Sequence, residues 1–261
     1  MNISFFILIG ILLQGIASPS AAREVHFDEP QLYYEAFFEG GLSLMINYSH
    51  RSLRHEGQGL THFPTQSVDN KVSTWLHGGQ HTPYYTNREH HHHLVSDHIQ
   101  DFVRYTSLLS PLMKPSGHKL GAWLTMIHAN NIWHLITYTL KFSVERQRPK
   151  YYFTRDPSAS NTHSFPSGHT GRTFVMAFIT DKLFDMPPWS RVALYTLAGS
   201  VGLLRITSDR HFFSDVIAAV GIAYFSASLS CYLFEPPYSE TVKSGLSFGL
   251  GPNQFSISYL F

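Results

Sequence analysis

Three short polar blocks, each placed where a long apolar stretch begins or ends, constrain most strongly how this chain can fold. In chain order they read Lys141-x6-Arg148-Pro149, Pro166-Ser167-Gly168-His169 and Arg205-x5-His211-x3-Asp215. Together they supply three cations, two histidines, one carboxylate and a glycine-containing helix start. This inventory suits a site that holds a phosphate group and attacks its phosphorus atom.

The apolar stretches predict an all-α bundle, because their hydrophobic residues recur with helical spacing and prolines interrupt them. The expected helices cover residues 31–38, 69–76, 96–112, 119–147, 167–186, 190–206 and 210–234. Residues 150–166 are expected to form a loop. At 261 residues the chain is long enough to bury a substantial core.

The two ends of the chain differ from this helical middle. An apolar run at residues 5–13 followed by small residues at 20–22 is typical of a cleaved export signal. Residues around Gly251-Pro252-Asn253 alternate in polarity, which predicts a short β-hairpin. We therefore expect a signal peptide at 1–22, an irregular N-terminal region packed on the core at 23–93, a helical domain at 94–237 and a hairpin tail at 238–261.

Residues 216–234 carry no charge and are long enough to span a membrane. They are also rich in Ala, Ser and Gly, which suits close helix packing. The helix expected at 119–147 contains His128, Asn130, Asn131 and His134, which are poor lipid-facing residues. The pattern favours a soluble bundle, with peripheral membrane contact left open.

Composition excludes some classes of function. The net charge is +1, so the chain has no basic field of the kind that binds nucleic acid. Cys231 is the only cysteine, which excludes an intramolecular disulfide. A run of four histidines at 90–93 admits a metal-binding interpretation. A solvated loop before a helix is favoured, because no carboxylate or cysteine accompanies the run at ligand spacing.

The first block places two cations on one helical face. Lys141 and Arg148 are seven residues apart, two helical turns, and Pro149 ends the helix beside them. Two stacked cations can clamp an anion. Arg146 and Lys150 lie nearby, so a solvated basic face is the alternative when this block is taken alone.

The second block opens a helix. Ser167 can cap it, Gly168 lets a ligand approach the backbone, and the free amides of the first turn can bind a phosphate oxygen. His169 would then lie beside the bound anion. Taken alone, an ordinary N-cap followed by an exposed histidine is an equal alternative.

The third block pairs a histidine with a carboxylate. His211 and Asp215 are four residues apart, so they share a helical face if the helix includes both. An aspartate that accepts a hydrogen bond from one ring nitrogen leaves the other as a nucleophile or base. A simple surface pair is the alternative, and the neighbouring Phe212 and Phe213 argue against it.

These blocks in this order resemble the type 2 phosphatidic acid phosphatase superfamily, which includes bacterial acid phosphatases and vanadium haloperoxidases. The resemblance covers about residues 95–235 and departs from the family pattern at Leu204, where the family usually has Ser. It implies a helical bundle of this superfamily's type. It also implies that His211 forms a phosphohistidine, that Asp215 orients it and that His169 is the general acid. The remaining implied phosphate-binding groups are Lys141, Arg148, Ser167, Gly168 and Arg205.

The function expected from the resemblance is an exported, metal-independent phosphomonoesterase of the periplasm or cell envelope, with membrane association left open. Its partner is a lipid phosphate or a soluble phosphate ester, with vanadate as an inhibitor, and no cofactor, metal or nucleic acid is expected. Two alternatives stay open: a vanadium-dependent haloperoxidase, and a non-catalytic His-rich envelope binding protein.

Overall fold

The protein is described here by a computed structural model. It describes residues 41, 64–77, 87–113, 119–154, 162–184, 186–234, 245–251 and 254–260. The expected export signal and the helix predicted at 31–38 lie outside these residues. The boundaries of the four expected segments stay predictions.

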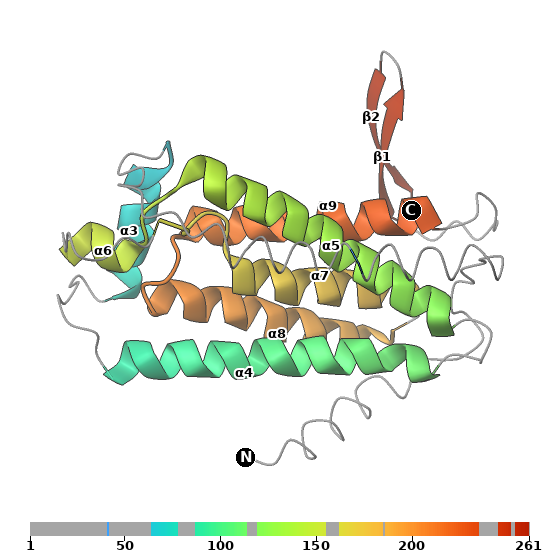
Figure 1. Ribbon diagram of the computed structural model, residues 1–261, viewed down its shortest axis with the longest axis horizontal. Helices are drawn as coiled ribbons and strands as arrows, with labels where there is room; N and C mark the ends of the chain where they lie inside the picture. The colour runs from blue at the N-terminus through green and yellow to red at the C-terminus, as the bar shows by residue number, and fades with distance from the viewer. Residues whose placement is uncertain are drawn as a thin grey trace.

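The described chain forms a bundle of long helices (Figure 1). In order the helices are α3 (Gln66–Leu76), α4 (Asn87–Leu109), the 3-10 helix η2 (Ser110–Met113), α5 (Lys119–Val144), α6 (Pro149–Thr154), α7 (Gly168–Leu183), α8 (Pro188–Thr207) and α9 (Phe213–Phe234). The prediction of an all-α bundle is confirmed.

Helix α7 is the centre of the bundle and packs against α4, α5, α8 and α9. The core around it combines large and small side chains, and Gly171 makes the closest approach. A Cβ atom at this position would overlap the indole ring of Trp133 on α5. The absence of a side chain at Gly171 therefore allows α5 and α7 to pack closely.

Three helix predictions need correction. Helix α4 begins at Asn87, nine residues before the expected start at 96, so the histidine run is helical and is not a loop. Helix α6 occupies part of the expected loop at 150–166.

Helix α5 ends at Val144, where Glu145 takes a positive φ of 45°, and so it ends before the expected 147 and is not ended by Pro149. Arg148 therefore lies outside the helix that carries Lys141, and the expected shared helical face is wrong. Pro149 instead suits the first position of α6, where its missing N–H costs nothing.

The predicted hairpin is present as β1 (Gly245–Gly251) and β2 (Gln254–Leu260), which pair antiparallel. The register joins Gly251 to Gln254 next to the turn.

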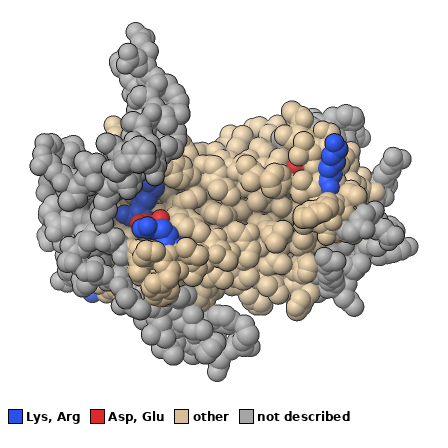
Figure 2. Space-filling view, turned by 180° about the vertical axis from the view of Figure 1, so that it is seen from behind, with Lys and Arg blue, Asp and Glu red and all other residues tan. Residues whose placement is uncertain are grey.

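Among the residues described, the charged side chains visible in Figure 2 lie at the two ends of the bundle face, and the band between them shows none. Among the described residues, only Phe213–Leu233 of α9 is long and apolar enough to cross a membrane. Just 39% of its most apolar window is buried. Several large hydrophobic side chains on the helices are exposed: Leu135, Val192, Leu203, Ile217, Phe225 and Tyr232.

Candidate active site

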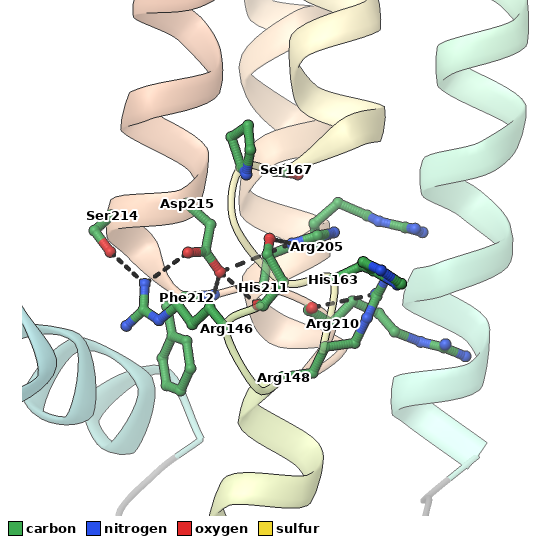
Figure 3. A network of polar contacts seen from close by, with 12 residues as sticks. Arg146, Arg148, His163, Ser167, Arg205, Arg210, His211, Phe212, Ser214 and Asp215 are labelled. Atoms are coloured by element: carbon green, nitrogen blue, oxygen red, sulfur yellow. Dashed lines mark hydrogen bonds and ion pairs between the residues drawn. The ribbon is translucent and has the colours of Figure 1, made fainter. Parts of the chain in front are cut away.

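All three sequence blocks meet at one end of the bundle, where α5 and α8 end and α7 and α9 begin (Figures 1 and 3). In Figure 3, His211 lies between the Asp215–Arg146 pair on one side and Arg205 and Arg148 on the other. The expected site residues are thus brought together, and their roles stay proposals.

Lys141 ties the first block to the second. Its Nζ atom donates hydrogen bonds to the carbonyl oxygens of His163 and Pro166, at 2.8 and 2.7 Å. Its Cε atom lies 3.9 Å from the Cβ position of Gly168. Burial, together with the charge of Arg148, lowers the pKa of the Lys141 ammonium to about 7. An anion bound here would favour the charged form of this lysine.

Ser167 joins the start of α7 to the start of α9. Its backbone amide donates to the carbonyl oxygen of Asp215 at 3.0 Å. Ser167 occupies the N-cap position as predicted, but its hydroxyl makes no capping bond and lies 2.9 Å from the Thr170 hydroxyl. The second and third blocks are therefore fixed to each other through the backbone.

Arg205 is buried, with 3% of its surface exposed. Its NH2 group donates to His169 Nδ1 at 2.9 Å. Its NH1 group donates to His93 Nδ1 at 2.6 Å, and to the Ser96 hydroxyl and Asp97 Oδ1, both at 3.1 Å. Helix α4 thus fixes a cation that the third block contributes.

Arg148 lies on the same side of His211 as Arg205 (Figure 3). Its NH1 group donates to the carbonyl oxygen of Arg210 at 3.3 Å. Its charge and those of Lys141 and Arg205 all lower the pKa of His211. The three predicted cations therefore act electrostatically on one histidine, as a phosphate clamp around that residue requires.

His211 is buried, and its hydrogen bond determines which ring nitrogen is reactive. Nδ1 lies 2.7 Å from the carbonyl oxygen of Ser164, which only accepts, so Nδ1 carries the proton. Nε2 therefore has the lone pair. Burial is the largest cause that lowers the pKa of His211 well below its usual value. The imidazole is neutral and ready to act as a nucleophile.

The expected direct bond between His211 and Asp215 is absent. Asp215 Oδ2 lies 3.8 Å from His211 Nδ1, and it accepts instead from the Ser164 hydroxyl at 2.6 Å and from the Phe212 amide at 2.8 Å. The physical reason is that α9 begins at Phe213, so His211 precedes the helix and does not share its face with Asp215. Asp215 reaches the histidine indirectly, by orienting Ser164.

Arg146 is the principal residue missed by the sequence interpretation, which left it on a solvated face. It is 1% exposed and bridges two buried carboxylates, Asp215 at 2.6 Å and Asp69 of α3 at 2.8 Å. Its guanidinium group also lies over the Phe212 ring, 4.1 Å from the ring centre. The spacing of residues in the sequence does not show that Arg146 is buried, so this role could not be predicted from the sequence.

Asp69 of α3 contributes a buried carboxylate to the site from the N-terminal part of the chain. It accepts from the Ser214 amide at 2.9 Å, and so satisfies a free N–H in the first turn of α9. It also accepts from the hydroxyls of Ser214 and Thr65, both at 2.7 Å. Burial alone would raise the pKa of Asp69, but these hydrogen bonds and that from Arg146 lower it. Asp69 therefore stays ionised beside the arginine.

The second histidine of the site, His169, is held by α4. Its Nε2 atom lies 3.0 Å from Asp97 Oδ1, and about a third of each side chain is exposed. Burial lowers the pKa of His169 to about 4, with Arg205 acting in the same direction and Asp97 opposing it. His169 is therefore neutral at neutral pH while no phosphate is bound.

The histidine run takes part in the site, contrary to the expectation of a solvated loop. His92 Nδ1 lies 2.9 Å from the Thr207 hydroxyl, and His93 accepts from Arg205. Both residues contact the C-terminal end of α8, because the longer α4 carries them there. A carboxylate also accompanies the run: Asp97 is one turn after His93, at 3.5 Å. No group of side chains in the described part of the chain has the arrangement of a metal site.

Comparison with known proteins agrees with this geometry. Residues 119–237 match the model of the PAP2 superfamily. The matched segment contains all three polar blocks. This confirms the predicted resemblance, because PAP2 is the type 2 phosphatidic acid phosphatase superfamily.

Two proteins similar in sequence are both named lipid A 1-phosphatase. The one from Porphyromonas gingivalis is 43% identical over 77 residues, which is 28% of this chain and 17% of the relative. The one from Rhizobium johnstonii is 27% identical over 179 residues, 59% of this chain and 68% of the relative. The chain thus matches less than a fifth of the first relative and about two thirds of the second.

Among solved structures, the crystal structure of Aquifex aeolicus LpxE superposes with a TM-score of 0.51 at 17% identity. The match covers 67% of this chain and 99% of that one. This likeness shows that the bundle shares its fold with that protein.

Proposed function

We propose that the protein is a phosphatase that hydrolyses phosphomonoesters through a phosphohistidine at His211. The observation that carries the proposal is the hydrogen bond from His211 Nδ1 to the Ser164 carbonyl oxygen. This bond to the backbone fixes the orientation of the imidazole ring and leaves the lone pair on Nε2. Three cations, Lys141, Arg148 and Arg205, act on the same imidazole. A bare nucleophile among fixed cations suits attack on a phosphoryl group.

The proposed reaction has two steps. In the first, the P–O bond to the leaving alcohol breaks as the bond from phosphorus to His211 Nε2 forms, and His169 gives a proton to the alcohol oxygen. In the second, a water molecule attacks phosphorus, His169 takes its proton and the P–N bond breaks. The three cations neutralise the phosphoryl oxygens throughout, which is the main requirement of phosphoryl transfer. We propose that this charge makes an added metal ion unnecessary.

We propose a lipid phosphate as the substrate. Both curated relatives are named for hydrolysis of the 1-phosphate of lipid A. The bundle face in Figure 2 has an uncharged band, and α9 exposes the apolar side chains of Ile217 and Phe225. Contact of this band with a membrane would bring a lipid headgroup to the cations at the bundle end, and we place the protein in the cell envelope after export.

The two alternatives make different demands on the same residues. A vanadium haloperoxidase would use His211 Nε2 to hold vanadate, and would then need halide and peroxide for activity. A binding protein would keep the cations and give no turnover. The names of the relatives favour the phosphatase.

The test is hydrolysis by the purified full chain in detergent, with EDTA present. p-Nitrophenyl phosphate and a diacylglycerol phosphate serve as substrates, with and without orthovanadate, and His211→Ala is assayed beside the wild type. The proposal predicts turnover that survives EDTA, is inhibited by vanadate and disappears in the variant.

Turnover that survives in His211→Ala would refute the phosphohistidine. Turnover that EDTA abolishes would refute metal independence. Peroxidase activity that depends on halide and vanadate, without ester hydrolysis, would replace the proposal with the haloperoxidase alternative.

A further inference from the structure

We propose that Asp97, on α4 and outside the segment that matches the PAP2 model, is a positioning residue that makes Nδ1 of His169 the proton-donating atom of the site. The inference rests on the proposed function for its catalytic meaning. Its structural content, the tautomer of His169, is independent of that function.

The hydrogen bonds of His169 allow one arrangement of its proton. Arg205 can only donate, so His169 Nδ1, 2.9 Å from Arg205 NH2, must accept and carries no proton. The neutral ring then has its proton on Nε2, which lies 3.0 Å from Asp97 Oδ1 and donates to it. This carboxylate and this arginine therefore define both the tautomer and the ring orientation.

The same arrangement identifies the atom that faces the substrate. Nδ1 is directed towards Arg205, one of the cations proposed to bind phosphate, whereas Nε2 is directed away towards α4. A phosphate oxygen bound by Arg205 competes with Nδ1 for the arginine N–H. Once released, Nδ1 can take a proton, and the resulting imidazolium keeps its Nε2–H bond to Asp97.

Asp97 is itself held as an anion in the right place. Burial would raise its pKa, but the bonds and charges of His169, Arg205 and His93 lower it. Asp97 Oδ1 accepts hydrogen bonds from Arg205 NH1, at 3.1 Å, and from His169 Nε2. One oxygen atom thus links the phosphate clamp to the proton donor, and binding at Arg205 is transmitted to His169.

The charges around His169 come from three helices. Asp97 and His93 face it from α4, the latter with ring centres 6.5 Å apart. Arg205 faces it from the end of α8, and Arg172 acts on it from its own helix. Asp97 is the only carboxylate among these groups. It is therefore the group that can stabilise an imidazolium here.

The proton balance of the proposed step follows. His169 Nδ1–H gives its proton to the departing alkoxide when the P–O bond breaks, and the neutral Nε2–H tautomer remains on Asp97. The attacking water later returns a proton to Nδ1. Asp97 accepts a hydrogen bond throughout and does not itself gain a proton.

The kinetic test compares Asp97→Asn with Asp101→Asn, one turn further along α4, on two substrates. One is p-nitrophenyl phosphate, whose leaving group needs little protonation, and the other is an alkyl phosphate, whose leaving group needs it. Asp97→Asn is expected to lower kcat on the alkyl ester by about 10- to 100-fold, and much less on the aryl ester, because general acid catalysis is lost. Asp101→Asn is expected to leave both unchanged.

His169→Ala should show the same dependence on the leaving group, and combining it with Asp97→Asn should cause no further loss. An equal fall in kcat on both substrates, or a change in KM alone, would overturn the proposal, because Asp97 would then act only through Arg205. Undiminished kcat on the alkyl ester would overturn it as well.

A measurement without turnover separates this proposal from the proposed function. In protein labelled with 15N-histidine, the His169 resonances, assigned with His169→Ala, should report the neutral Nε2–H tautomer in the wild type. In the presence of tungstate, the pKa of His169 should be higher in the wild type than in Asp97→Asn. A wild-type Nδ1–H tautomer, or equal pKa values in the two proteins, would overturn the inference whether or not the protein is a phosphatase.

Discussion

The two histidines of the site are held in contrasting ways. His211 is 2% exposed and donates to a backbone carbonyl of the 162–167 segment, so this hydrogen bond lies within the segment that matches the PAP2 model. His169 is about one third exposed and held by Asp97, a side chain of α4 outside the matched segment. The proposed nucleophile, His211, is held by a backbone carbonyl, whereas the proposed acid, His169, is held by a charged side chain that can stabilise its protonated form.

This difference matches what each group must do. A nucleophile needs one constant orientation and an unprotonated nitrogen, which burial and surrounding cations supply. An acid must gain and lose a proton in each cycle, which requires some solvent access and a partner for the charged form. In the proposed mechanism, the segment that matches the PAP2 model carries the attacking group, and the preceding helix α4 positions the proton donor.

The largest effect is expected at the rigid histidine. His211→Ala removes the only group proposed to bond with phosphorus, and activity should fall by at least about 1000-fold on every substrate. The fall should be independent of the leaving group, unlike that of His169→Ala. Steady-state kinetics with aryl and alkyl phosphates checks this prediction. A loss of activity in His211→Ala that varies with the leaving group would contradict the different roles given to the two histidines.

The frame around His211 is expected to be the next most sensitive. Arg146→Met leaves Asp69 and Asp215 buried without their shared cation, which should reduce the free energy of unfolding by about 3–5 kcal/mol. Arg191→Met is the matched control, because Arg191 pairs with Asp181 at a site where it is 45% exposed. The control should cost at most about 1 kcal/mol. Thermal or denaturant unfolding measures both. Equal losses of stability in the two variants would show that the buried ion pairs of Arg146 contribute no more to stability than the exposed pair of Arg191.

Anion binding should depend on pH through Lys141. Because its pKa lies near 7 in the free protein, the ammonium is lost above that pH, and a bound anion must restore the proton. Inhibition by tungstate, which stays dianionic in this range, should weaken by roughly tenfold per pH unit between pH 7 and 9. Lys141→Arg should flatten this profile. A flat wild-type profile would show that Lys141 stays charged in the free enzyme.

The smallest effect is expected at Ser164. Ser164→Ala removes the hydroxyl that bonds to Asp215 but keeps the carbonyl that holds His211. The loss should be about 1 kcal/mol in stability or in kcat/KM. A far larger loss in kcat/KM would mean that Asp215 controls the nucleophile more strongly than the backbone does.

Sequence could predict the assembly of the site because each polar block lies beside the end of an apolar helix. Helices that run side by side bring such ends together, and so Lys141, Ser167 and Arg205 lie at one end of the bundle, as expected. The partner of His211 could not be predicted, because the spacing of four residues matters only inside a helix and α9 begins two residues later.

The supporting residues could not be found from sequence for another reason. Asp69 and Arg146 are 77 positions apart in the chain, and Asp97 and His169 are 72 apart, so no local pattern links them. A charged residue is usually solvated, and burial of Arg146 depends on a carboxylate from a distant helix. The early start of α4 likewise depends on contacts of His92 and His93 with α8.

The most direct test of the central claim is to trap the phosphoenzyme. p-Nitrophenyl phosphate labelled with 32P, whose leaving group needs little protonation, is mixed with the His169→Ala variant, in which the proposed second step should be slowed, and the reaction is quenched with alkali. The account predicts a burst of alkali-stable, acid-labile label that maps to the peptide containing His211. Label on another residue, or turnover without any labelled protein, would contradict it.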